Sequence, residues 1–348
     1  MRPLETLYIP VTIFCNLNCV HCNIWKTRLP SEVSLEKRCE FISYIGKVSP
    51  DTQVALTGGE PFTRPDILYK LLSTSKRTSL PTLVTTNGTL VTRELAEKAV
   101  REGLQTIFIS LDSHLPEIHD RIKGVPGTFD KAVQAIKHFQ KVKKDLNTNL
   151  KIGINAILGS WNMESLDKLV EYFQDELKIE VITFNPLQSV EPSHESLLDN
   201  PHFPSFPQVK IGINMLKTLR FRSSSVSLSL DDLEAFQQYF FSPIVLEKPV
   251  CESAERNLVV GFNGDVSLCT MGLFQPIGNI ITDSFETILA GRNNKTLLEK
   301  MANCKRTCGL ASCNRKSPYK EVPPFVKKVV LRYFPSFIRR FNRFLLRN

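Results

Sequence analysis

The chain has 348 residues, 42% of them hydrophobic, and a formal net charge of +9. This size and composition fit a globular protein of two domains with a tail. No uninterrupted apolar run reaches the roughly 18 to 20 residues that a membrane span needs, and no secretory signal precedes the first strand. We therefore expect a cytoplasmic protein, and its nine cysteines are expected to bind metal more than to form disulfides.

The positive charge is concentrated in one segment. Residues 322–348 hold seven basic residues and no acidic ones, and subtracting these seven charges from +9 leaves +2 for the rest of the chain. A nearly neutral body argues against a broad phosphate-binding face, so we expect no nucleic-acid partner.

The first predicted strand leads into a cluster of thiols. The apolar run Val11–Phe14 indicates a buried strand, and Cys15, Cys19 and Cys22 follow it within eight residues. Thiolates select iron–sulfur clusters, zinc or copper(I), and three of them on one loop predict a metal centre with a free coordination position. Iron–sulfur is favoured over zinc, because structural zinc usually takes four protein ligands.

The spacing C-x3-C-x2-C after a first strand resembles the signature of radical S-adenosylmethionine (SAM) enzymes. The resemblance implies that Cys15, Cys19 and Cys22 hold a 4Fe-4S cluster, whose open iron binds the amino and carboxylate groups of SAM. The residue before the last cysteine is usually aromatic in that family, and here it is His21.

The next three predicted β/α units each end in polar or glycine-rich loops. Ser34–Gly46 predicts a helix, within which Cys39 is expected to be a packed thiol. Strands are predicted at 53–56, 82–85 and 106–110, with a helix at 92–102. In a parallel barrel the loops after these strands open on the face where chemistry occurs.

These loops carry further positions that match the family. Thr57–Pro61 resembles the GGEP segment, in which Gly58, Gly59 and Glu60 would hold the SAM amino group. By the same resemblance, Asn87, Ser110 and Asp112 are assigned to SAM, the last two through its ribose. Arg121 is assigned to the SAM carboxylate, which a guanidinium matches bidentately; its alternative partners are Asp120 and Glu117.

Two more units complete the predicted barrel. Strands are expected at 151–158 and 180–184, with helices at 128–143 and 163–176, and Asn155 and Ile157 are candidate adenine contacts. Six units in residues 7–190 predict an α/β fold of the partial (β/α)6 barrel type. Residues 188–207 are expected to form a loop over the barrel mouth, followed by helices at 208–220 and 231–241.

A second cysteine group lies near the end of the chain. Strands at 257–262 and 265–268 flank the Asn263-Gly264 hairpin signal, and one helix is predicted at 284–301. Such a small unit needs a metal centre for stability, and zinc is an alternative on chemistry alone. The cysteines of this group are Cys251, Cys269, Cys304, Cys308 and Cys313.

The pattern Cys251-x12-Gly264-x4-Cys269 resembles the SPASM and twitch extensions of radical SAM enzymes. Five cysteines imply one auxiliary 4Fe-4S cluster. Cys251, Cys269 and Cys304 are then its firmer ligands, with Cys308 or Cys313 as the fourth. The expected domains are a radical SAM core at 1–230, an auxiliary domain at 231–316 and a tail at 317–348.

The tail has the pattern of a basic amphipathic helix. Phe337, Phe341 and Phe344 share one face, while Arg339, Arg340, Arg343 and Arg347 lie on the other. Such helices bind anionic membranes, so a peripheral position on the inner membrane face is expected. Docking on the barrel or on a partner protein is the alternative.

The resemblance implies reductive cleavage of SAM to a 5′-deoxyadenosyl radical, which takes hydrogen from a substrate. A flavodoxin or ferredoxin would supply the electron. The expected substrate is a small or membrane-associated metabolite, such as a sugar or lipid-linked intermediate, and the auxiliary cluster would assist its redox modification. A maturase of ribosomal peptides is the first alternative, although no leader-binding domain precedes the first strand. A non-catalytic iron–sulfur scaffold or electron-transfer protein is the second alternative. The sequence does not indicate which residue would act as a catalytic acid or base.

Overall fold

The computed structural model describes residues 4–27, 32–188, 200–241 and 253–304. Six β/α units occupy its first half. The strands are β1 (Thr6–Thr12), β2 (Gln53–Gly58), β3 (Thr82–Thr86), β4 (Thr106–Ser110), β5 (Lys151–Leu158) and β6 (Val181–Pro186). Their helices are η1 (Ile24–Lys26), α1 (Leu35–Val48), η2 (Pro61–Thr63), α2 (Pro65–Arg77), α3 (Arg93–Glu102), α4 (Pro116–Lys123), α5 (Thr128–Asp145), α6 (Leu166–Glu171) and the π-helical turn η3 (Tyr172–Glu176).

The second half adds helices and three short strands. These are α8 (Phe206–Arg222), α9 (Leu230–Phe241), α10 (Ser253–Arg256), β7 (Asn257–Val260), β8 (Asp265–Ser267), β9 (Gly278–Asn279), α11 (Phe285–Gly291) and α12 (Lys295–Ala302). The helix predicted at 284–301 is therefore two helices, because residues 292–294 interrupt it and the Asn294 side chain caps α12.

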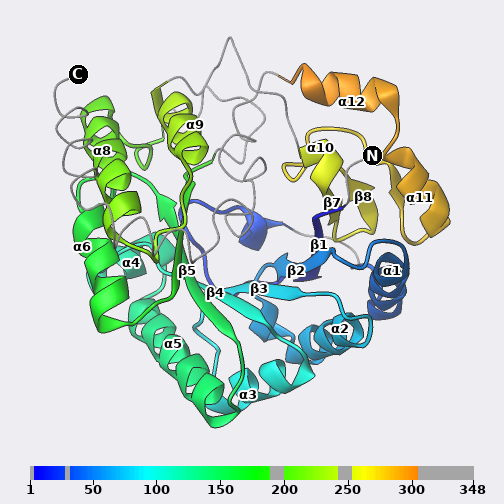
Figure 1. Cartoon of the computed structure of the whole chain (residues 1–348), viewed down its shortest axis with the longest axis horizontal. Coiled ribbons are helices and arrows are strands. Elements are labelled where there is room, and N and C mark those ends of the chain that lie inside the picture. The colour runs from blue at the N-terminus through cyan, green and yellow to red at the C-terminus, as the bar shows by residue number, and fades with distance from the viewer. Residues whose placement is uncertain (1–3, 28–31, 189–199, 242–252, 305–348) are drawn as a thin grey trace, which may run out of the picture. The chain divides into compact units, whose positions relative to one another are not determined.

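One sheet joins all the strands, in the order β6-β5-β4-β3-β2-β1-β7-β8-β9. Neighbours from β6 to β1 are parallel, and β1 also pairs in parallel with β7, while β7, β8 and β9 are antiparallel. The parallel α/β sheet is typical of the partial barrel that the sequence predicts. Figure 1 shows helices α1, α2, α3 and α5 along the outer side of this curved sheet.

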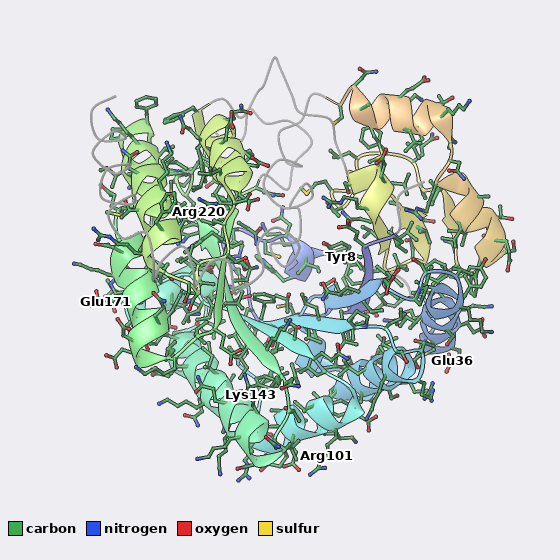
Figure 2. The ribbon with its side chains drawn as sticks, viewed as in Figure 1. Tyr8, Glu36, Arg101, Lys143, Glu171 and Arg220 are labelled. Atoms are coloured by element: carbon green, nitrogen blue, oxygen red, sulfur yellow. The ribbon has the colours of Figure 1, made fainter. Side chains whose placement is uncertain are left out.

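Burial alternates along β3, β4 and β6 and separates two faces of the sheet. In β4, Ile107 and Ile109 are fully buried, while Phe108 and Ser110 are half-buried. The buried set packs with apolar residues of the outer helices in one continuous core, as expected where helices cover a parallel sheet. Charged side chains such as Arg101 and Glu171 lie on the outer helices, whereas Tyr8 lies on the inner strand β1 (Figure 2). The opposite, concave face carries the half-buried set.

Candidate active site

The three early cysteines lie on the loop that leaves β1. The strand begins at Thr6 and ends at Thr12, so it lies earlier than the apolar run Val11–Phe14 suggested. Cys15, Cys19 and Cys22 are all half-buried free thiols, and the Cys22 amide donates to the Cys19 carbonyl at 3.2 Å. We call residues 13–23 the cysteine loop.

Gly58 and Gly59 lie against the start of the cysteine loop. The Gly59 amide donates to the Thr12 carbonyl at 2.7 Å, and the Glu60 amide donates to the Phe14 carbonyl at 2.8 Å. A Cβ on Gly58 would lie 2.3 Å from the Thr12 oxygen, and one on Gly59 would lie 2.1 Å from the Phe14 oxygen. Only glycine allows this approach, so both residues position the segment that precedes Cys15.

Glu60 uses its carboxylate inside the protein. The side chain is 1% exposed and accepts hydrogen bonds from the Thr86 hydroxyl (2.6 Å), the Asn87 amide (2.7 Å) and the Phe62 amide (3.0 Å). Burial raises the pKa of the Glu60 carboxyl, while these hydrogen bonds oppose the increase. The carboxylate thus joins the loops after β2 and β3.

Asn87 joins the loop after β3 to the cysteine loop. Its Nδ2 donates to Asn16 Oδ1 at 3.0 Å, and the Asn16 amide group donates to the Thr89 hydroxyl at 2.8 Å. Asn87 Oδ1 accepts from the Thr89 amide and hydroxyl at 2.9 and 2.7 Å. These bonds fix Asn16, which is adjacent to Cys15.

A charge pair, which the sequence did not indicate as functional, supports the end of β1: Arg38 is buried, Glu32 is half-buried, and their side chains lie 3.6 Å apart. Arg38 of α1 is 2% exposed and donates to the carbonyls of Pro10, Val11 and Val33 at 2.6–2.8 Å. Glu32 accepts from the Thr12 hydroxyl at 2.9 Å and the Ile13 amide at 2.8 Å. The only sequence signal was that Arg38 shares the apolar stripe of its helix with Ile42 and Ile45.

Asp112 and Lys123 form a second charge pair, and both of its members are buried. Asp112 is fully buried, and its Oδ2 lies 2.7 Å from Lys123 Nζ, while its Oδ1 accepts from the Ile157 amide at 2.8 Å. Burial alone would raise the pKa of Asp112, but the Lys123 ammonium lowers it to about 2. The predicted cation Arg121 is exposed, so Lys123, two residues later, is the cation that α4 buries here.

The buried pair lies beside the cysteine loop. The Val20 amide donates to the Ile122 carbonyl at 3.0 Å. Burial and, to a smaller extent, the Lys123 charge lower the pKa of His21 to about 4, so this imidazole is neutral at pH 7. The His21 ring lies 6.1 Å from that of Trp161, which in turn lies 5.8 Å from that of His202.

Neutral polar side chains line the concave face of β4, β5 and β6. Ser110 is in register with Asn155, and Asn155 is in register with Thr183. Asn155 Oδ1 accepts from the Thr183 hydroxyl at 3.1 Å and from Asn185 Nδ2 at 2.5 Å. We call these four residues the polar strip. Neither Thr183 nor Asn185 was predicted as functional, although their alternation with buried Ile182 and Phe184 was visible in the sequence.

The second cysteine group is described in part. Cys269 follows β8 and is 8% exposed, and Cys304 follows α12, with its amide donating to the Met301 carbonyl at 3.2 Å. Cys251, Cys308 and Cys313 lie outside the described residues, so the auxiliary ligand set stays a prediction.

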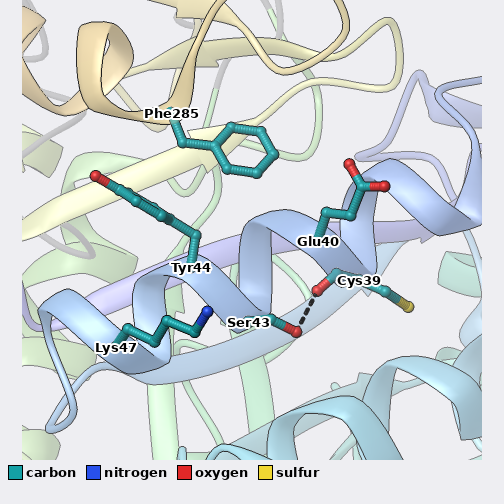
Figure 3. A pocket seen from close by; sticks show the side chains of 6 residues that line it. All are labelled: Cys39, Glu40, Ser43, Tyr44, Lys47 and Phe285. Atoms are coloured by element: carbon teal, nitrogen blue, oxygen red, sulfur yellow. Dashed lines mark hydrogen bonds between the residues drawn. The ribbon is translucent and has the colours of Figure 1, made fainter.

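A hollow of about 420 Å³ lies between α1 and α11 (Figure 3). Its lining includes Cys39, Tyr44 and Phe285, and none of the predicted site residues. Cys39 accepts a hydrogen bond from the Thr74 hydroxyl at 3.4 Å, in keeping with a packed thiol.

The early cysteines suit a cluster better than a single ion. In the described ranges, no group of three or more His, Cys, Asp or Glu side chains is placed so that it could hold a single metal ion. The Cys19 thiol interacts electrostatically with those of both Cys15 and Cys22. Three neighbouring thiols on one loop, each free to bind a different iron, fit the donor set of a 4Fe-4S cluster.

Known proteins share both the sequence pattern and the fold. The radical SAM superfamily profile matches residues 9–173, and the SPASM iron–sulfur cluster-binding domain profile matches residues 251–314. An AdoMet-dependent heme synthase of Methanosarcina barkeri is 32% identical over 163 residues, which are 46% of this chain and 44% of that protein. A probable GTP 3′,8-cyclase of Thermococcus kodakarensis is 33% identical over 44% of this chain and 50% of its own. The chain thus spans half or less of these relatives.

Solved structures extend the likeness of fold. The structure of anSMEcpe with bound AdoMet and a Cp18Cys peptide aligns with a TM-score of 0.67 and 17% identity, covering 98% of this chain and 100% of that one. SuiB of Streptococcus suis aligns with a TM-score of 0.64 and 18% identity, covering 89% and 72%. The two profile matches, together with the cysteine loop on a parallel sheet, show that the chain belongs to the radical SAM superfamily, with a SAM-binding 4Fe-4S cluster and a C-terminal SPASM iron–sulfur domain.

Proposed function

We propose that this radical SAM enzyme carries out a redox modification of a small, hydroxyl-rich metabolite, such as a sugar or a lipid-linked intermediate. The observation that supports this proposal is the polar strip on the concave face. Ser110, Asn155, Thr183 and Asn185 present hydroxyl and amide groups and no charge. Such groups recognise neutral hydroxyl-bearing molecules through hydrogen bonds, and they disfavour a charged group that would lose its hydration without a partner.

Some residues of the chain would hold the cluster, and others would orient the substrate. Cys15, Cys19 and Cys22 would hold the SAM-binding cluster, which with SAM supplies a one-electron step and a hydrogen-abstracting radical. Gly58, Gly59, Asn87 and the Arg38–Glu32 pair fix the cysteine loop. Thr183 and Asn185 of the polar strip would orient the substrate, while Ser110 at the strand end and Asn155 are the candidate contacts of the strip to SAM.

The SPASM domain supports a redox outcome. Cys269 and Cys304, with Cys251 and either Cys308 or Cys313, would hold an auxiliary cluster able to take an electron from the substrate. A flavodoxin or ferredoxin would deliver the electron that starts each cycle. Because the chain belongs to the radical SAM enzymes, we no longer consider it a non-catalytic scaffold.

The tail at 317–348 would bring the enzyme to an anionic membrane, which suits a lipid-linked substrate. Its amphipathic pattern is the support for this proposal. None of the helices in the part of the chain that the structure describes is long and apolar enough to cross a membrane.

A peptide is the alternative substrate, because amide and hydroxyl side chains also bind a peptide backbone. The test uses an extract of the source organism grown in fully deuterated medium and separated into small-molecule, lipid and peptide fractions. Each fraction is incubated with reduced, reconstituted enzyme and unlabelled SAM, and deuterium in 5′-deoxyadenosine is measured by mass spectrometry. Transfer from the small-molecule or lipid fraction supports the proposal, and transfer from the peptide fraction alone contradicts it.

A variant checks that the polar strip recognises the substrate. Replacing Asn185 by Leu should abolish deuterium transfer from the active fraction, while unproductive SAM cleavage under dithionite continues. If transfer persists at the wild-type rate, the polar strip does not bind the substrate.

A further inference from the structure

The end of α4 lies directly against the cysteine loop. The Val20 amide donates to the Ile122 carbonyl at 3.0 Å, and a Cβ on Gly124 would lie 2.4 Å from Asn18 Oδ1. These two contacts flank Cys19 on the loop and Lys123 on the helix. The backbones of Cys19 and Lys123 are therefore neighbours.

The Lys123 ammonium has a fixed position. Its residue is 3% exposed, and Nζ lies 2.7 Å from Asp112 Oδ2. Asp112 is held in turn by the Ile157 amide at 2.8 Å and by Asn162, whose Nδ2 donates to the Asp112 carbonyl at 2.9 Å. The charge thus has little freedom to move when the charge of its surroundings changes.

Lys123, the positive member of this ion pair, interacts electrostatically with the thiols of the cysteine loop. Of the electrostatic interactions made by the Cys19 thiol, the one with Lys123 is larger than the one with Asp112. Lys123 also interacts with the thiols of Cys15 and Cys22. At the cysteine loop the pair therefore acts as a net positive charge.

We propose that Lys123 sets the reduction potential of the cluster held by Cys15, Cys19 and Cys22, through its ammonium fixed beside Cys19. Reduction adds one electron to a centre already bound by anionic thiolates, and a fixed cation in a poorly solvated site lowers the free energy of the reduced state. Stability is a weak reason for the pair, because burying two charges costs about as much solvation as their attraction returns. This role concerns the SAM-binding cluster, so it does not depend on which substrate the enzyme uses.

The test is a redox titration of the reconstituted full-length enzyme, followed by electron paramagnetic resonance. It is done without SAM, so a role confined to SAM binding leaves the potential unchanged. The auxiliary cluster serves as an internal reference, and a variant with Cys15, Cys19 and Cys22 all replaced by Ala identifies its signal. Lys123→Met is compared with Lys123→Arg, which retains the charge, and with Lys137→Met, which removes an exposed lysine of α5.

A double variant guards against misfolding. Lys123→Met leaves the Asp112 carboxylate buried without its cation, whereas Asp112→Asn combined with Lys123→Met removes both charges at similar volume. We expect Lys123→Met and the double variant to lower the reduction potential of the SAM-binding cluster. The potential of the auxiliary cluster should not change in any variant. In Lys123→Arg and Lys137→Met, the potential of the SAM-binding cluster should stay close to that of the wild type. An unchanged potential in the double variant overturns the proposal. If SAM affinity, measured by calorimetry, falls at unchanged potential, Lys123 is a SAM ligand and the proposal is likewise overturned.

Discussion

At the scale of single residues, the site depends on how closely the two glycines of the GGEP segment approach the cysteine loop. The family resemblance assigns Gly58, Gly59 and Glu60 to SAM. The structure adds that their backbone pairs with Thr12 and Phe14, and that the Glu60 carboxylate is engaged by three donors of the protein. These residues therefore shape the cluster site from behind, whatever contacts their remaining groups make with SAM.

Replacing Gly59 by Ala should reduce cluster binding. The new Cβ would lie 2.1 Å from the Phe14 oxygen, so the segment before Cys15 must shift. We expect a large loss of iron and sulfide at the early site, measured by metal analysis and by the spectrum of that cluster. Lys70→Ala is the control, because Lys70 is an exposed residue of α2. Full cluster content in Gly59→Ala would refute the positioning role.

Arg38 supports the same loop through backbone carbonyls. Arg38→Met should leave three buried carbonyls without their charged donor. Each unsatisfied carbonyl should lower the free energy of unfolding by up to about 3 kcal/mol. We expect a lower melting temperature and faster cluster loss in air, with partial recovery in Arg38→Lys, which keeps one ammonium donor. Cluster loss is followed by absorbance, with Lys47→Met on the exposed face of α1 as the control. Equal rates of loss in Arg38→Met and wild type would contradict this role.

At the scale of elements, Asp120 shows how the turn before α5 is built. Its carboxylate accepts from the Gly127 amide (2.5 Å), the Thr128 hydroxyl (2.8 Å) and the Phe129 amide (2.8 Å). It therefore caps the N-terminus of α5, which is where a negative charge is favourable. The sequence offered Asp120 only as a partner for Arg121.

Asp120→Ala should destabilise the protein by about 1 kcal/mol, the usual value of a helix cap. Burial raises the pKa of Asp120, but the hydrogen bonds of the cap lower it overall. Its contribution is thus present above the unfolded pKa near 4 and is lost as the pH falls through the lower folded value. Chemical unfolding at pH 7 and at acidic pH should show the variant approaching wild type as the pH falls. A difference that grows toward low pH would contradict the assignment.

The sequence predicted elements best where burial alternates or where caps are clear. The bounds of β4 and β5 agree with the predicted strands because apolar and half-buried residues alternate along β4 and the apolar run of β5 is long. Lys123 was missed because its role depends on its contacts with Asp112 and with the cysteine loop. Only the fold brings these parts of the chain together. Arg38 was missed for the same reason, since a buried arginine in an apolar stripe has no local signature of its partners. The pairing of β7 with β1 was also beyond local patterns, because strand order is set by contacts far apart in the chain.

At the scale of the whole molecule, the tail offers a test of localisation. Deleting residues 317–348 removes eight basic residues, one acidic residue and the aromatic face, a net charge of +7. Each basic charge contributes about 1 kcal/mol near an anionic surface. We expect the full chain, but not the truncated one, to float with liposomes containing phosphatidylglycerol, and high salt to weaken this binding. Liposomes of phosphatidylcholine alone serve as the control. Equal flotation of both chains would remove the membrane proposal.

The pairing of β1 with β7 has a consequence for synthesis on the ribosome. Thr6 lies beside Asn257 in the finished sheet, so one edge of the first strand has no neighbour until some 250 residues have been made. The nascent barrel therefore exposes an open strand edge for most of translation, in the part of the chain that carries the first three cysteines. Once β7 has left the ribosome, it can pair with β1 and close that edge. The sheet of the N-terminal half is therefore complete only after the C-terminal half has been made.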